Sequence, residues 1–184
     1  MIDRDEAIIW LKKYLYDDKL IKHSLAVEAI MSNIAHYLDK NVELWKLVGL
    51  LHDLDYEYTK GNPENHSQIT SELLDGLIPE EGINAIKAHN YLYSKYIPAS
   101  SIDKSLISAD AASGLIIASA LVMPSKKLNE VKIESLIKKY NDKTFAKGCD
   151  RKRIKLCLDV GIEVEKFLEL SLSALKEISN DLDL

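Results

Sequence analysis

Apolar residues recur at helical spacing through nearly the whole chain, and no segment alternates apolar and polar residues like a half-buried strand. Residues 20–38 show this clearly, because their apolar positions fall on one side of a helix that also carries His23. Asp3 and Glu6 have the spacing of a capping box, which would open a first helix. The pattern predicts an all-α protein with helices at about 3–14, 18–38, 42–53, 63–76, 79–89, 106–123 and 162–181, and one or two more before the last.

The 184 residues are enough for one domain with a real core, and a hydrophobic fraction of 47% is typical of a globular protein. We find no internal repeat, low-complexity tract or linker. We therefore expect a single domain over residues 1–184. Its core, at about 18–124, holds the candidate ligands described below, and a C-terminal helical extension covers about 125–184.

The segment from Leu106 to Met123 is long enough to cross a membrane and carries a single charge, Asp110. Its serines and many small residues fit the buried central helix of a helical domain better. The N-terminus has acids where a signal peptide has bases. Cys149 and Cys157 do not form a C-x-x-C pair and are interpreted as reduced thiols. We expect a cytoplasmic protein that does not bind membranes.

The net charge of −5 gives no overall attraction to a large nucleic acid or an anionic membrane, so an anionic substrate would need a local positive charge. Residues 125–155 hold eleven of the 24 basic residues against four acids. Lys126 and Lys127 directly follow the apolar helix and are the predicted substrate-binding lysines. The alternative is a solvated helix face.

His52 and Asp53 are adjacent at the end of a very apolar helix, LVGLLHD. Burying this pair costs free energy unless hydrogen bonds, a protein cation or a metal ion compensate. The dipeptide alone is equally compatible with a structural hydrogen-bonded pair.

Asp110 lies within the most apolar helix of the chain, where an unpaired carboxylate would be very unfavourable. The basic residues nearest to it in sequence, Lys104 and Lys126, fall near the ends of that helix. A metal ion is therefore a reasonable partner for Asp110.

Candidate metal ligands lie at core-facing or helix-terminal positions on five predicted helices. They are His23, His52, Asp53, His66, His89 and Asp110. Imidazole and carboxylate together suit Fe, Mn, Ni, Co or Zn, and Mg is possible. Six ligands exceed what one ion with an open position needs, and they suit two divalent ions that share a carboxylate.

The ligand order resembles the HD superfamily of metal-dependent phosphohydrolases, in particular its dinuclear branch with six ligands. The similar segments are KHSLAVEAI, GLLHDLDYE, ENHSQITSELL, INAIKAHN and SADAASGLI. The chain is also similar to bacterial proteins described only as predicted HD-superfamily hydrolases. The resemblance implies an HD-domain helical bundle in which His23, His52 and Asp110 hold one ion, His66 and His89 hold the other, and Asp53 bridges both.

The chain departs from the family where Leu54-Asp55-Tyr56 follows the His-Asp pair, because many relatives have Ile-Gly-Lys there. A possible phosphate-binding lysine is thereby lost. We expect Asp55 to contribute to catalysis by orienting a ligand histidine or a metal-bound water. The alternative for Asp55 is a solvated loop carboxylate.

The resemblance implies hydrolysis of a phosphomonoester or phosphodiester, with a nucleotide-like small molecule as substrate and a metal-activated hydroxide as nucleophile. Two alternatives stay open. The same ligands serve di-iron oxygenases of the superfamily, and a nucleotide-sensing domain would bind without turnover.

Overall fold

The protein folds into ten α-helices and two short 3₁₀ helices, and a computed structural model describes all 184 residues. No strand forms, which confirms the predicted all-α class. In chain order the helices are α1 (Arg4–Tyr14), α2 (Asp18–Tyr37), α3 (Val42–Leu51), α4 (Tyr56–Thr59), α5 (Gln68–Leu73), α6 (Glu80–His89), α7 (Ser101–Leu121), η1 (Leu128–Glu130), α8 (Ile133–Asn141), α9 (Arg151–Ile154), η2 (Lys155–Val160) and α10 (Val164–Glu177).

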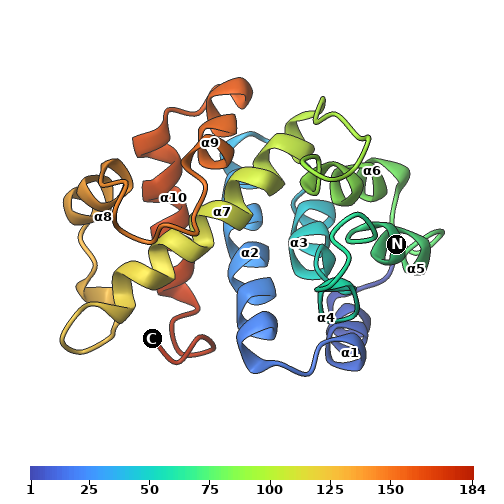
Figure 1. The fold of residues 1–184 in the computed structure, drawn as a ribbon, viewed down its shortest axis with the longest axis horizontal. Coiled ribbons are helices and arrows are strands. Elements are labelled where there is room, and N and C mark those ends of the chain that lie inside the picture. The colour runs from blue at the N-terminus through green and yellow to red at the C-terminus, as the bar shows by residue number, and fades with distance from the viewer.

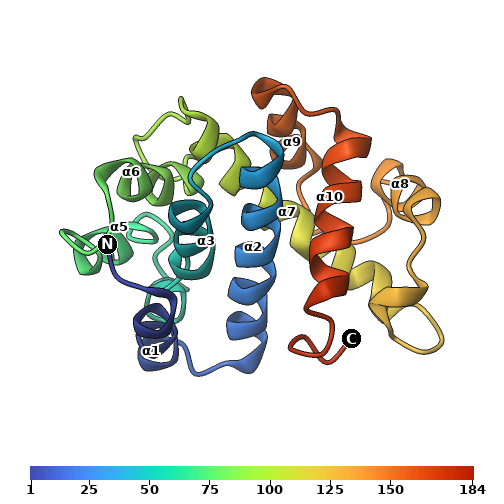
Figure 2. The same ribbon diagram turned by 180° about the vertical axis from the view of Figure 1, so that it is seen from behind.

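Helices α2 and α3 lie side by side at the centre, and α10 covers the other side of α2 (Figures 1 and 2). Helix α7 crosses α2 in Figure 1, with α6 near its first half and α8 near its second half. The predicted capping box at Asp3 and Glu6 is confirmed at the start of α1.

A glycine allows α2 and α3 to approach closely. A Cβ atom at Gly49 of α3 would lie 2.9 Å from the Val27 carbonyl oxygen of α2, closer than a side chain tolerates. This contact brings the His23-bearing helix against the helix that ends before His52.

Helix α7 is long and apolar enough, by length and composition alone, to cross a membrane. Inside this protein 67% of its most apolar window is buried, and α2, α6 and η2 pack on it. The expected central helix is therefore present, and it begins earlier than predicted because Ser100 and Asp103 form a capping box.

The C-terminal segment joins the same apolar core as the rest of the chain. Leu136, Ile154 and Phe167 are fully buried in one cluster with Leu50 and Ala109. The segment therefore packs on α7 instead of standing apart from it.

The predicted helix from Pro63 is wrong at its start, because α5 begins only at Gln68. Residues 63–67 form turns, and Ser67 has a left-handed backbone with φ of 72°. His66 therefore lies in a turn before the helix. The helix predicted to include His52 and Asp53 likewise ends at Leu51.

Candidate metal centre

Six side chains that are far apart in sequence meet at one point of the fold. His23 comes from α2, His52 and Asp53 follow α3, and the remaining three come from the turn before α5, the last residue of α6 and the middle of α7. Those three are His66, His89 and Asp110. The structure thus brings together all six residues predicted as ligands.

The carboxylate of Asp53 is the centre of the cluster. The Nε2 atoms of His52, His66 and His89 lie 3.4, 3.2 and 3.3 Å from its Oδ1 atom. Nε2 of His23 lies 3.6 Å from its Oδ2 atom. Two groups of three side chains share Asp53, one with His23 and His52 and one with His66 and His89, and each has ligand atoms within 4.8 Å of one another.

Two of the imidazoles are oriented by the backbone of their own helices. Nδ1 of His52 donates to the Gly49 carbonyl at 2.9 Å, and Nδ1 of His89 donates to the Ile86 carbonyl at 2.5 Å. A carbonyl only accepts, so each Nδ1 carries the proton and each Nε2 offers a lone pair to the cluster.

The other two imidazoles are oriented by side chains. Nδ1 of His66 donates to Asp55 Oδ1 at 2.7 Å. Ser113 donates its hydroxyl proton to the Asp110 carbonyl at 2.8 Å, so its oxygen accepts from Nδ1 of His23 at 3.2 Å. Nε2 is therefore also the nitrogen that His66 and His23 turn toward the cluster, and it can bind a cation once its proton is lost.

When the imidazoles are neutral, this arrangement leaves their lone pairs facing each other. Nε2 of His23 lies 3.3 Å from Nε2 of His52, and the corresponding distance between His66 and His89 is 3.0 Å. Neutral imidazoles with these tautomers repel at such distances unless a cation lies between them. The donor set therefore fits bound divalent metal ions.

Burial and the neighbouring charges shift the pKa values of the cluster residues in opposite directions. Burial lowers the pKa of His52 to about 4 despite the nearby Asp53 carboxylate. Burial would raise the pKa of Asp53, but the surrounding imidazoles hold it well below its usual value. Burial would lower the pKa of His66, but its bonds to Asp53 and Asp55 raise it to about 10. The protonation states of the histidines and of the Asp53 carboxylate thus depend strongly on one another.

Asp55 lies behind His66 and does not line the cavity above the cluster. The side chain is fully buried, and its Oδ2 atom accepts the Thr70 backbone N–H at 2.9 Å. Asp55 therefore ties His66 to the first turns of α5. Its contacts are those of a positioning residue.

Arg153 of α9 is a site residue that the sequence analysis missed. Its Nη2 atom donates to Asp110 Oδ2 at 2.7 Å and to the His89 carbonyl at 3.1 Å. Arg153 follows Asp110 by 43 residues, whereas Lys104 and Lys126 are much nearer to Asp110 in sequence. Lys104 in fact pairs with Asp159. The available signal was the basic run at 151–153, at the end of the basic segment.

Lys126 and Lys127 are not brought to the cluster. Both follow the far end of α7, about 16 Å or more along the helix from Asp110. Neither lysine lines the cavity over the cluster. Lys127 instead lies near Asp183, where Lys22 has the larger effect and Lys127 a smaller one in lowering the pKa of the Asp183 carboxyl.

A cavity of about 510 Å³ lies over the cluster. Its floor includes ligand side chains and Arg153, and its wall carries Tyr56, Tyr93, Lys60 and Asn90. Tyr56 and Tyr93 are 39% and 59% exposed, so flat aromatic surface is available at the opening. The cavity has the size of a small-molecule site.

A family model for the HD domain matches residues 20–145, well over half of the chain. The chain therefore belongs to the HD domain family, whose members are generally metal-dependent phosphohydrolases. Membership implies binding of divalent metal, and the clustered histidines and aspartates are the candidate ligands. No curated protein and no solved structure gives a significant match.

Proposed function

We propose that the protein is a dinuclear metal-dependent phosphohydrolase that cleaves a phosphomonoester or phosphodiester of a nucleotide-like small molecule in the cytoplasm. The single observation that supports this most is the pair of three-residue groups sharing Asp53, with imidazole Nε2 atoms facing inward. HD-family membership supports the reaction class.

In this proposal His23, His52 and Asp110 would hold one ion, His66 and His89 would hold the other, and Asp53 would be shared by both. Bound Fe, Mn, Ni, Co, Zn or Mg would supply an activated water and neutralise phosphoryl charge. Ser113, Asp55 and the backbone carbonyls behind the imidazoles keep the ligand atoms turned toward that position. All of these hydrogen bonds join groups of the protein itself, so they do not require a bound substrate.

Arg153 would bind a phosphoryl oxygen next to the ions. Only its Nη2 atom donates to the protein, and its Nη1 atom forms no hydrogen bond there, so the guanidinium retains donor capacity. Arginine suits this task because its planar donors match phosphate oxygens. Arg153 would then replace the phosphate-binding lysine that this chain lacks after Asp53.

Two tyrosines and a lysine at the opening support a nucleotide-like substrate. Exposed aromatic rings stack on nucleobases, and the Lys60 amine lies 5.8 Å from the Tyr56 ring centroid, beside the same cavity. A base on Tyr56 or Tyr93 would leave the phosphate directed toward the cluster.

The test is hydrolysis of p-nitrophenyl phosphate and bis-(p-nitrophenyl) phosphate by protein loaded with Mn²⁺, Fe²⁺ or Zn²⁺. We expect turnover that is abolished by His52→Ala and by Asp53→Ala. His36→Ala is the matched control, because His36 is exposed and bonds only the Ser32 carbonyl.

Absence of turnover across a broad panel of metals and phosphate esters would contradict the proposal. Tight nucleotide binding without turnover would then favour a sensing domain. Oxygen consumption by a mixed-valent iron form would favour the oxygenase, whereas full turnover with Zn²⁺ would exclude it.

A further inference from the structure

A second cavity opens beside the metal centre. It has a volume of about 400 Å³ and shares His23, Asp110 and Arg153 with the first. Its other wall is the loop between α8 and α9, through Ala146 and residues 148–150. A molecule bound at the metal centre therefore has a way to extend toward the C-terminal segment.

A third cavity, of about 440 Å³, adjoins the second, because Gly148, Cys149 and Asp150 line both. Its lining is strongly basic and includes one carboxylate, that of Asp150. The basic residues are Lys143, Lys147, Arg151, Lys152 and Lys155. Positive charge is thus concentrated next to the metal centre in a chain whose net charge is −5.

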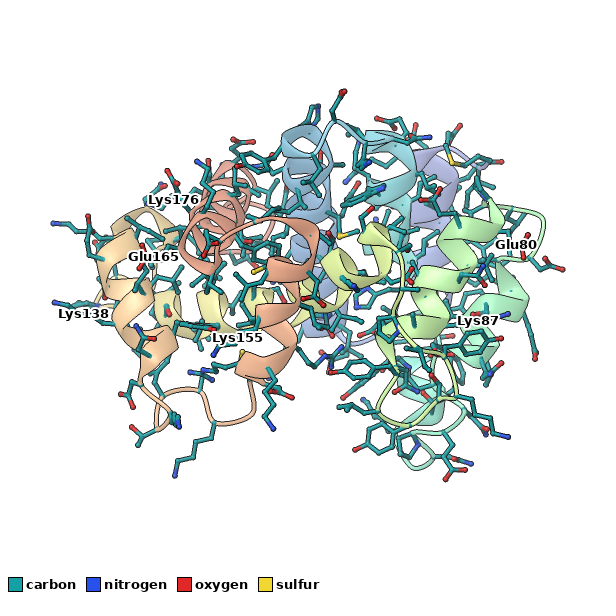
Figure 3. All side chains as sticks on the ribbon, turned by 90° about the horizontal axis from the view of Figure 1, so that it is seen from above. Glu80, Lys87, Lys138, Lys155, Glu165 and Lys176 are labelled. Atoms are coloured by element: carbon teal, nitrogen blue, oxygen red, sulfur yellow. The ribbon has the colours of Figure 1, made fainter.

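Four of these cations are not neutralised by the protein. Lys143, Lys147, Lys152 and Lys155 form no ion pair within the protein. Figure 3 shows Lys155 among the C-terminal helices, on the other half of the molecule from Lys87. Unpaired cations in a concave surface attract anions more strongly than the same charges on a flat one.

The loop that presents these lysines is held in one conformation by the guanidinium of Arg151. The five N–H groups of this side chain lie within hydrogen-bond distance of six backbone carbonyls, two of which share one Nη2 proton; the carbonyls are those of Lys139, Tyr140, Asp142, Phe145, Ala146 and Cys149. Six carbonyls around one guanidinium leave the loop little freedom.

The loop and α9 are also attached to α7 beside the ligand Asp110. The Cys149 thiol donates to the Ala111 carbonyl at 2.9 Å, and Ser108 Oγ donates to the Arg153 carbonyl at 3.1 Å. The basic cavity therefore has a fixed position relative to the metal centre. This is what a subsite for one end of a substrate requires.

We propose that the second and third cavities form a second anion-binding subsite, which binds another phosphate group of the substrate while the first phosphate lies at the metal centre. The substrate class is thus a small molecule with two separated phosphate groups. Arg153 contacts the reacting phosphate, and the lysines at 143, 147 and 155 contact the distant one. The proposal rests on the proposed function for the identity of the reacting group.

The experiment compares binding of alkanediol bisphosphates of increasing length with binding of the matching monophosphates, by calorimetry on metal-loaded protein. We expect the bisphosphate to bind about tenfold or more tightly at one preferred length. Lys143→Gln/Lys147→Gln/Lys155→Gln should abolish that preference, leave monophosphate affinity unchanged and leave turnover of p-nitrophenyl phosphate unchanged. Arginine at the same three positions should restore the preference.

The matched control removes the same charge from exposed lysines outside every cavity described, as Lys12→Gln/Lys19→Gln/Lys40→Gln. It should keep the bisphosphate preference. Equal affinity of bisphosphates and monophosphates in the unchanged protein, or equal losses in both triple variants, would overturn the inference. Turnover with no bisphosphate preference would overturn it while leaving the proposed function intact.

Calorimetric binding needs no turnover, so a bisphosphate preference in an inactive protein would support the subsite while contradicting the hydrolase. A single-stranded oligonucleotide is the competing ligand. If it binds more tightly than every bisphosphate, and if the triple lysine variant loses this binding, the basic surface binds nucleic acid and the small-molecule inference is overturned.

Discussion

At the scale of single residues, each imidazole of the metal centre depends on one hydrogen-bond acceptor behind it. The acceptors are two backbone carbonyls, the Ser113 hydroxyl and the Asp55 carboxylate. Of these, Asp55 is the one charged group, and it is also fully buried. A conservative change there tests how far positioning controls metal binding.

Asp55→Asn should weaken metal binding by about 10- to 100-fold, the usual effect of losing a carboxylate behind a ligand histidine. The two Asp55 oxygens accept from His66 Nδ1 and from the Thr70 backbone N–H, whereas an amide has a single oxygen for these two donors. Competition with a chelator measures the affinity. The exposed Asp75→Asn is the control, and equal affinities in both variants would refute the positioning role.

Arg153 is the second residue whose role the contacts define. Arg153→Ala should lower kcat/KM by about 10- to 100-fold and weaken inhibition by inorganic phosphate, because a charge-assisted hydrogen bond contributes about 1.5–3 kcal/mol. Arg153→Lys should recover part of the loss, since it keeps the charge without the planar donors. Steady-state kinetics with Lys40→Ala as control checks this. Unchanged phosphate inhibition in Arg153→Ala would exclude phosphate contact.

At the scale of elements, the close approach of α2 and α3 sets the spacing between the first histidine and the His-Asp pair. Gly49 permits this approach, because its missing Cβ atom would meet backbone atoms of Val27 and Glu28 at 2.9–3.0 Å. Backbone atoms cannot rotate away as a flexible side chain does.

Gly49→Ala should destabilise the protein by about 1–3 kcal/mol, the usual cost of overpacking. Gly114→Ala in α7 is the matched control, since nothing lies within 4 Å of its Cβ position. There the better helix propensity of alanine should stabilise by about 0.5–1 kcal/mol. Urea denaturation measures both, and equal effects of the two substitutions would show that the α2–α3 contact is not tight.

At the scale of the whole molecule, the metal centre joins three helices and two loop positions that are distant in sequence. Bound metal would therefore connect most of the fold, and metal binding would be linked to the stability of the native state.

Removal of metal with a chelator should lower the melting temperature. Ligand at 100 times its dissociation constant stabilises by about 2.7 kcal/mol, and for a chain of this size that corresponds to about 5–10 °C. Differential scanning calorimetry with and without Mn²⁺ measures the shift. His36→Ala should show the full shift and His66→Ala a smaller one; a shift that is equal in both would place the metal elsewhere.

The sequence alone determined the all-α class, the approximate helices, the capping box at Asp3, the buried helix around Asp110 and the family. These features depend on helical periodicity, on residues three or four positions apart, or on the order of the ligand residues along the chain. All of these can be read directly from the sequence. The error at the start of α5 arose because the left-handed backbone of Ser67 interrupts the helix that the sequence pattern predicts.

Only the tertiary structure decided which atoms face one another. The convergence of the candidate ligands follows from how α2, α3, α6 and α7 pack together. The pairing of Arg153 with Asp110 and the basic cavity follow from how the C-terminal segment packs on α7. The contact between Arg153 and Asp110, 43 residues apart, leaves no periodic pattern in the sequence. It forms because helices that are distant in sequence pack together to bury apolar surface. That is why Lys126 and Lys127, near in sequence, were chosen instead of Arg153, which is near in space.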